Sequence, residues 1–103
     1  MALLIWTERA LEDIENIAEF ISKDSEKYAK IQVQKFFKSA ESLQSNCKIG
    51  RIVPELNRKE IRELILANYR LIYRIVSDEH IDIISVHHSY RLLKNNPAFK
   101  NKK

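Results

Sequence analysis

Apolar and polar residues follow two different periods along this chain, and the change of period divides it in two. A short apolar run over residues 2–6 predicts a strand that ends at Trp6. Thr7 then has the side chain of a helix cap, and Glu8 suits the positive end of the helix that follows. The apolar residues of that helix recur at intervals of three and four, which predicts one buried face: Ile14, Ile17, Ala18 and Ile21.

A second helix is predicted after the polar break at residues 23–25, where Asp24 or Ser25 can cap it. Its apolar stripe has the same helical spacing and predicts an end near Ser45: Ala29, Val33, Phe36, Phe37, Ala40 and Leu43. Because the break is so short, the two helices are expected to form an antiparallel hairpin.

Beyond Ser45 the pattern becomes that of loops and strands. A polar segment holds Gly50, the only glycine of the chain, which we expect to serve a backbone angle that other residues disfavour. Three runs rich in β-branched and aromatic residues follow, at Ile61–Leu66, 69–76 and 81–87. The two or three residues between these runs are typical of turns that join antiparallel neighbours.

The predicted order is therefore β-α-α-β-β-β, an α+β fold. An N-terminal helical hairpin is expected to pack on a mainly antiparallel, twisted four-stranded sheet. We expect one domain over residues 1–95 and a basic C-terminal tail over residues 96–103. Arg70 and Arg74 are four residues apart on one predicted strand. Because every second side chain of a strand points to the same side, the two share a side of the sheet and predict a positive face there.

Composition excludes several classes of protein. The single cysteine, Cys47, excludes an internal disulfide and any multi-cysteine metal site, and it favours a cytoplasmic location. No apolar run approaches the roughly 20 residues that cross a bilayer, so no membrane partner is expected. His87 and His88 lack a third ligand at useful spacing, and we expect no metal and no other cofactor.

Charge is distributed unevenly. Residues 1–46 contain six Lys or Arg and eight Asp or Glu, whereas residues 47–103 contain twelve and six, so charges of −2 and +6 give the net +4. A basic half of this kind attracts nucleic acid or an acidic protein segment, although it is also typical of a solvated surface.

Four segments of the second half together resemble the ParE/RelE superfamily of toxins. They occur in order and with compatible spacing, and with the opening Trp6-Thr7 the likeness spans about residues 3–93: Gly50-Arg51-Ile52-Val53-Pro54-Glu55, Ile61-Arg62-Glu63-Leu64, Tyr69-Arg70-Leu71-Ile72-Tyr73-Arg74, and Ile84-Ser85-Val86-His87-His88-Ser89-Tyr90-Arg91.

The resemblance implies the toxin of a bacterial type II toxin–antitoxin module, held inactive by a cognate antitoxin protein. The ParE branch poisons DNA gyrase, and the RelE branch cleaves mRNA on the ribosome. The four segments look closer to ParE, which implies growth inhibition by binding rather than catalysis. A non-toxic binding module of the same fold is a further reading. A homodimer and a toxin–antitoxin hetero-oligomer both stay open.

Two sets of site residues follow from the resemblance. For binding a target or an anion, the set comprises Arg51, Arg62, Arg70, Arg74 and Arg91. Arg70→Ala is then expected to reduce growth arrest with the fold intact. RNA cleavage instead needs a base, a proton donor and a cation at the phosphate, and that set comprises Glu55, Arg70, His88 and Tyr90. Ser89 stands where the related nucleases have a histidine, which favours a binding protein.

Overall fold

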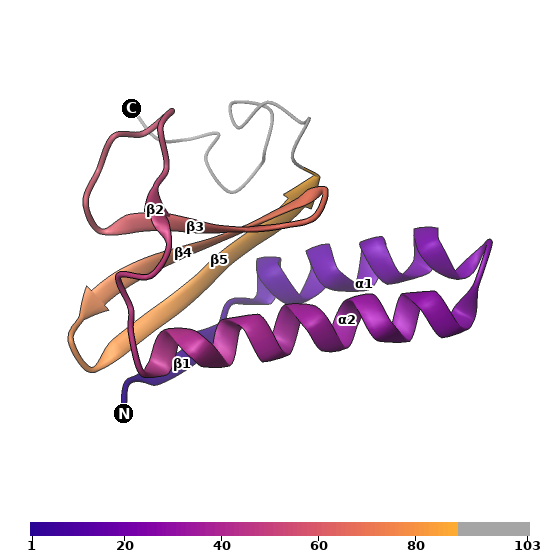
Figure 1. Ribbon diagram of the computed structural model, residues 1–103, viewed down its shortest axis with the longest axis horizontal. Coiled ribbons are helices and arrows are strands. Elements are labelled where there is room, and N and C mark those ends of the chain that lie inside the picture. Colours follow the sequence, from indigo (N-terminus) through magenta and orange to yellow (C-terminus); the bar gives the residue numbers. More distant parts are fainter. Residues whose placement is uncertain (89–103) are drawn as a thin grey trace.

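The computed structural model describes residues 1–88, so the predicted basic tail lies outside the described residues. Figure 1 shows two helices side by side along one face of a sheet. Neither helix in residues 1–88 is long and apolar enough to cross a membrane. The elements are β1 (Leu3–Trp6), α1 (Glu8–Ser22), α2 (Glu26–Glu41), a 3-10 turn η1 (Ser42–Gln44), β2 (Arg51–Ile52), β3 (Ile61–Leu66), β4 (Tyr69–Ser77) and β5 (His80–His88).

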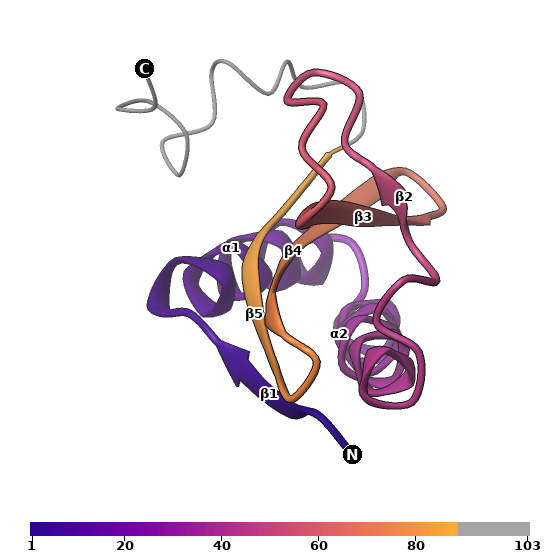
Figure 2. The same cartoon turned by 90° about the vertical axis from the view of Figure 1, so that its left-hand side faces the viewer.

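The sheet has five strands in the order β1-β5-β4-β3-β2, with β1 parallel to β5 and every other pair antiparallel. Figure 2 shows β1 and β2 at opposite sides of the sheet. The predicted helical hairpin and mainly antiparallel sheet are confirmed, but the prediction of four strands is wrong. The additional strand is β2, which lies inside the predicted loop. Two residues are too few to show an alternating pattern, so β2 left no periodic signal.

Side-chain caps begin both helices. The Thr7 hydroxyl oxygen accepts a hydrogen bond from the Ala10 amide at 3.2 Å and donates one to the Ile83 carbonyl at 2.7 Å. Thr7 therefore caps α1 and also joins it to β5. Ser25 rather than Asp24 caps α2, by accepting from the Tyr28 amide at 3.1 Å. The 3-10 turn η1 continues α2 to Gln44, which accounts for the predicted end near residue 45.

Two apolar cores lie on opposite faces of the sheet. The larger one joins the helices to the sheet and includes Phe36, Leu71 and Tyr73. A smaller one packs residues of the loop after β2 against the other face, because alternate residues of β4 point to opposite sides. Its members are Val53, Leu56, Ile61, Ile72 and Ile84. The loop after β2 is therefore held down on the sheet, and it brings Glu55 with it.

Gly50 is needed for a close approach and not for an unusual backbone angle. No glycine has positive φ, so our expectation about its backbone angle is wrong. A Cβ atom at Gly50 would lie only 2.6 Å from the Tyr73 hydroxyl and 2.6 Å from the Glu63 carbonyl oxygen. Glycine is required because the loop passes directly over β3 and β4 at this point.

Candidate functional site

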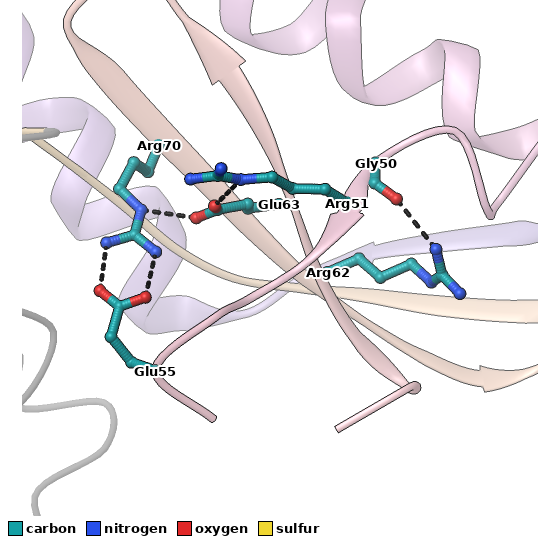
Figure 3. Close-up of polar contacts among 6 residues, drawn as sticks. All are labelled: Gly50, Arg51, Glu55, Arg62, Glu63 and Arg70. Atoms are coloured by element: carbon teal, nitrogen blue, oxygen red, sulfur yellow. Dashed lines mark hydrogen bonds and ion pairs between the residues drawn. The ribbon is translucent and has the colours of Figure 1, made fainter. Parts of the chain in front are cut away.

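Four charged side chains form a continuous chain of ion pairs on the sheet face opposite the helices (Figure 3). Glu63 lies in the middle and accepts from Arg51 Nε and from Arg70 Nε, each at 2.5 Å. Both terminal nitrogens of Arg70 donate to the Glu55 carboxylate, at 2.7 and 2.9 Å. We call this set the Arg–Glu chain: Arg51, Glu63, Arg70 and Glu55.

The strand register places three of these four residues together. Arg51 of β2 lies opposite Glu63 of β3, and Glu63 lies opposite Ile72 of β4. Arg70 precedes Ile72 by two residues and therefore points to the same face, as a diagonal neighbour of Glu63. Glu55 arrives from the loop that the smaller core holds against this face.

Burial differs sharply along the Arg–Glu chain. The side chains of Glu63 and Arg70 are 0% and 7% exposed, whereas those of Arg51 and Glu55 are 62% and 42% exposed. A buried charge without a partner is very unfavourable, so Glu63 and Arg70 depend on each other and on the two outer residues. The hydrogen bonds from Arg70 to Glu55 and Glu63 hold the pKa of Arg70 above its usual value despite burial. The Arg–Glu chain is thus a structural element with solvent at both ends.

The prediction that Arg70 offers positive charge on an open face of the sheet is wrong. Nε and both terminal nitrogens of Arg70 already donate to carboxylates, and the residue is buried. Removing its side chain leaves Glu63 with Arg51 as its one remaining ion-pair partner within residues 1–88, so Arg70→Ala should weaken the fold itself. Loss of growth arrest in Arg70→Ala would therefore not identify a target contact.

Glu55 is expected to make the free energy of unfolding depend on pH in the acid range. Its hydrogen bonds from Arg70 lower the Glu55 pKa from 4.5 to about 2. A lowered pKa contributes stability that is fully present above the unfolded pKa and lost as pH falls through the folded pKa. The difference in free energy of unfolding between wild type and Glu55→Gln should therefore be constant above pH 4.5 and shrink as the pH falls toward about 2.

Urea titrations at half-unit pH steps measure this difference. Glu41→Gln, at the end of α2, removes one carboxylate away from the Arg–Glu chain and serves as the matched control. If the difference in free energy of unfolding between wild type and Glu55→Gln stays unchanged down to pH 2, the low pKa of Glu55 is contradicted.

Comparison with known proteins shows which family the chain belongs to. Residues 4–93 match the sequence profile described as "ParE toxin of type II toxin-antitoxin system, parDE". The chain belongs to the ParE toxin family. The resemblance read from the four segments, and its placement nearer to ParE, are confirmed.

A solved structure shares the fold of this ParE-family chain. It is described as "Chromosomal ParDE TA system from P. aeruginosa" and superposes with a TM-score of 0.70. Sequence identity is 22%, and the match covers 85% of this chain and 96% of the other. At that identity the likeness concerns the fold alone. No protein with a curated functional description matches the chain.

The two histidines of this ParE-family chain point to opposite faces of β5. His87 lies opposite Arg70, and its charge contributes to the low pKa of Glu55. His88 lies opposite Tyr69, and its ring centroid is 5.6 Å from that of Tyr69, on the helix side. It is therefore His87, and not the His88 of the predicted nuclease set, that shares a face with Arg70. Tyr90 and Arg91 lie outside the described residues.

The remaining predicted cations differ in what they contact. Arg62 donates to two backbone carbonyls, that of Gly50 at 3.0 Å and that of Lys59 at 3.1 Å, and so fastens the loop. Arg74 is exposed and lies opposite Asp82 in the neighbouring strand. Arg51 and Arg74 are therefore the exposed members of the predicted binding set within residues 1–88, whereas Arg62 is half-buried.

Asp13 is a structural residue that the sequence did not single out. Its Oδ2 accepts from the Ser85 hydroxyl at 2.8 Å and from the Val86 amide at 3.0 Å. It thereby fastens α1 to the part of β5 that extends beyond β1. The signal available was its position in α1, one step from the buried Ile14 and three from the buried Ala10.

Proposed function

We propose that this ParE-family chain is a toxin that arrests growth in the cytoplasm by binding DNA gyrase, and that a cognate antitoxin neutralises it. The family supports the toxin, and the antitoxin is the partner that such a module implies. We propose binding rather than catalysis because of how the predicted nuclease residues Glu55, Arg70 and His88 are paired and placed.

The observation that carries the proposal is the pairing of Glu55 with Arg70. A carboxylate with a pKa of about 2 is a poor general base near neutral pH. Arg70 uses Nε and both terminal nitrogens for Glu63 and Glu55. His88 lies on the other face of the sheet. These three residues do not form an acid, a base and a phosphate site at one place.

Expression without an antitoxin tests the proposal. Growth should stop, mRNA 5′ ends should be unchanged, and the DNA-damage response should be induced. Purified gyrase incubated with supercoiled plasmid and this protein should accumulate cleaved plasmid. New 5′ ends at ribosomal A-site codons would overturn the proposal in favour of a nuclease, and normal growth would favour a non-toxic binding module.

Arg74→Ala is the variant that tests the target surface without disturbing the Arg–Glu chain. Arg74 is exposed, so its removal should leave the free energy of unfolding within about 0.5 kcal/mol of wild type. We expect weaker growth arrest and at least several-fold less cleaved plasmid. Lys27→Ala, on α2, removes one positive charge from the helical layer and is the matched control.

A further inference from the structure

β1 forms one border of the sheet, and its outer edge has no strand partner within residues 1–88 (Figure 2). The amides of Leu3 and Thr7 donate to carbonyls on the β5 side, at 2.7 and 3.1 Å. Because backbone groups alternate in direction along a strand, those of Leu4 and Trp6 point away from β5. Leu4 and Trp6 therefore each present an N–H and a C=O at an open edge.

This edge strand is held in place at both ends. The Ala2 amide donates to the Gln44 carbonyl at 3.3 Å, and the Gln44 side-chain amide donates to the Ala2 carbonyl at 2.9 Å. At the other end, the Thr7 hydroxyl donates to the Ile83 carbonyl at 2.7 Å. The strand between these anchors is ordered before any partner binds, which lowers the entropic cost of adding one.

β1 lacks the features that usually protect an edge strand from pairing. Such strands typically carry charged side chains, proline or a bulge. Leu3–Trp6 contains no charged residue and no proline, and its register with β5 is continuous. The opposite border of the sheet differs, because β2 is only two residues long and carries Arg51. Of the two borders, the β1 edge is the one that favours an added strand.

Two apolar side chains of β1 are exposed on the face opposite the helices. Leu3 is 58% and Ile5 is 40% exposed. Leu4 and Trp6 point to the other side and pack against the larger core. The smaller core contains no residue of β1, so it leaves Leu3 and Ile5 uncovered within residues 1–88. A partner strand at this edge would therefore meet apolar side chains on both faces.

β1 of a second copy of this chain fits the edge in both backbone and side chains. A two-fold axis through Ile5 would pair Leu4 of each copy with Trp6 of the other. These are the residues whose backbone groups point outward, so the symmetric register gives all of them hydrogen-bond partners. The two Ile5 side chains would lie directly opposite each other in a non-hydrogen-bonded pair, where side chains approach most closely.

We propose that two copies of this chain associate by antiparallel pairing of their β1 strands, which joins two five-stranded sheets into one. The contact is isologous, because the same edge serves both partners. A strand of four residues provides a small contact, so the dimer forms only at high protein concentration. The β1 edge lies across the sheet from the Arg–Glu chain, and the inference does not depend on gyrase binding.

Sedimentation of the purified full-length protein over a wide concentration range tests the proposal. Wild type should pass from monomer to dimer as its concentration rises. Ile5→Lys places like charges opposite each other at the axis and should weaken the dimer at least ten-fold. Ile31→Lys makes the same change at a 38% exposed isoleucine of α2 and should leave the affinity within two-fold. A monomer at every concentration, or a dimer weakened only by Ile31→Lys, would overturn the proposal.

The two-fold symmetry gives a second test. Because Ile5 lies opposite its own copy, an equimolar mixture of Ile5→Lys and Ile5→Glu should form a heterodimer at least ten-fold tighter than either variant forms with itself. An asymmetric contact at the same edge would place Ile5 against a different residue. The mixture would then gain nothing, and the proposal would fail.

Hydrogen exchange of wild type requires no variant and decides the case if the substituted chains do not fold. The amides of Leu4 and Trp6 should exchange at least ten-fold more slowly in concentrated than in dilute protein. The Leu3 amide is already bonded within one copy and should change much less. Unchanged exchange at Leu4 and Trp6, or slowing confined to other parts of the chain, would overturn the pairing.

Discussion

Glu63→Gln should lower the free energy of unfolding by about 3–5 kcal/mol, the typical cost of removing one partner from a buried ion pair. The Glu63 side chain is fully buried, and it is the residue that joins Arg51 to Arg70. Glutamine keeps the shape but not the charge, so Arg70 would remain buried with Glu55 as its one carboxylate. A domain of this size has a total stability of about 5–15 kcal/mol, so part of the population should unfold.

Urea unfolding followed by circular dichroism measures this effect. Glu60→Gln is the matched control, because Glu60 pairs with Arg58 at 2.8 Å on the surface. An exposed pair of this kind is worth about 0–1 kcal/mol. Similar losses in the two variants, or a loss below about 1 kcal/mol for Glu63→Gln, would show that the Arg–Glu chain is not a structural element.

Gly50→Ala should cost about 1–3 kcal/mol, as expected for a methyl group forced into a packed site. The added Cβ would lie 2.6 Å from the Glu63 carbonyl oxygen, which belongs to the sheet and cannot move aside easily. It would also push against the Tyr73 hydroxyl. That hydroxyl accepts from the Gly50 amide at 2.9 Å and donates to the Cys47 carbonyl at 2.7 Å.

Tyr73→Phe separates the clash from the hydrogen bonds. Alone it should cost about 1–3 kcal/mol, because the buried Gly50 amide and the Cys47 carbonyl lose their partner. The double variant should lose less than the sum of the two single losses, since the hydroxyl is one of the atoms that the new Cβ meets. Tyr28→Phe, at an exposed tyrosine of α2, is the control. Strict additivity, or Gly50→Ala within about 0.5 kcal/mol of wild type, would contradict this account.

The basic half of the chain is less positive on its surface than its sequence suggests. Three of its arginines, Arg51, Arg58 and Arg70, are bonded to carboxylates of the same half. The field that a polyanion would meet near the Arg–Glu chain is weakened accordingly. This favours recognition of a protein surface by a few exposed cations over wide attachment to nucleic acid.

Much of the secondary structure could be predicted from the sequence because its signals are local. The stripe that contains Ile14 and Ile17 and the capping side chains of Thr7 and Ser25 lie within a few residues of the features that they determine. The same holds for β3, β4 and β5, whose ends are marked by short polar separators. Neighbours along the chain are neighbours in space in these elements, so their pattern is visible without the fold.

The members of the candidate site were also visible, but their relations were not. Arg51, Glu55 and Arg70 belong to the predicted sets of site residues, and Glu63 lies in one of the four segments that carry the family resemblance. A formal charge does not reveal its partner, because partners depend on strand register and on where a loop returns. The distances between these charges exist only once β2, β3 and β4 are paired.

The sequence by itself thus determined the order of the two helices and of every strand except β2, the helical hairpin and the family. The tertiary structure alone decided that Arg70 is buried between two carboxylates, that His87 rather than His88 shares its face, and that Gly50 is required for closeness to Tyr73. The physical reason is range. Periodicity and capping act over about one to four residues, whereas these contacts join residues that only sheet pairing and the fold of the loop bring together.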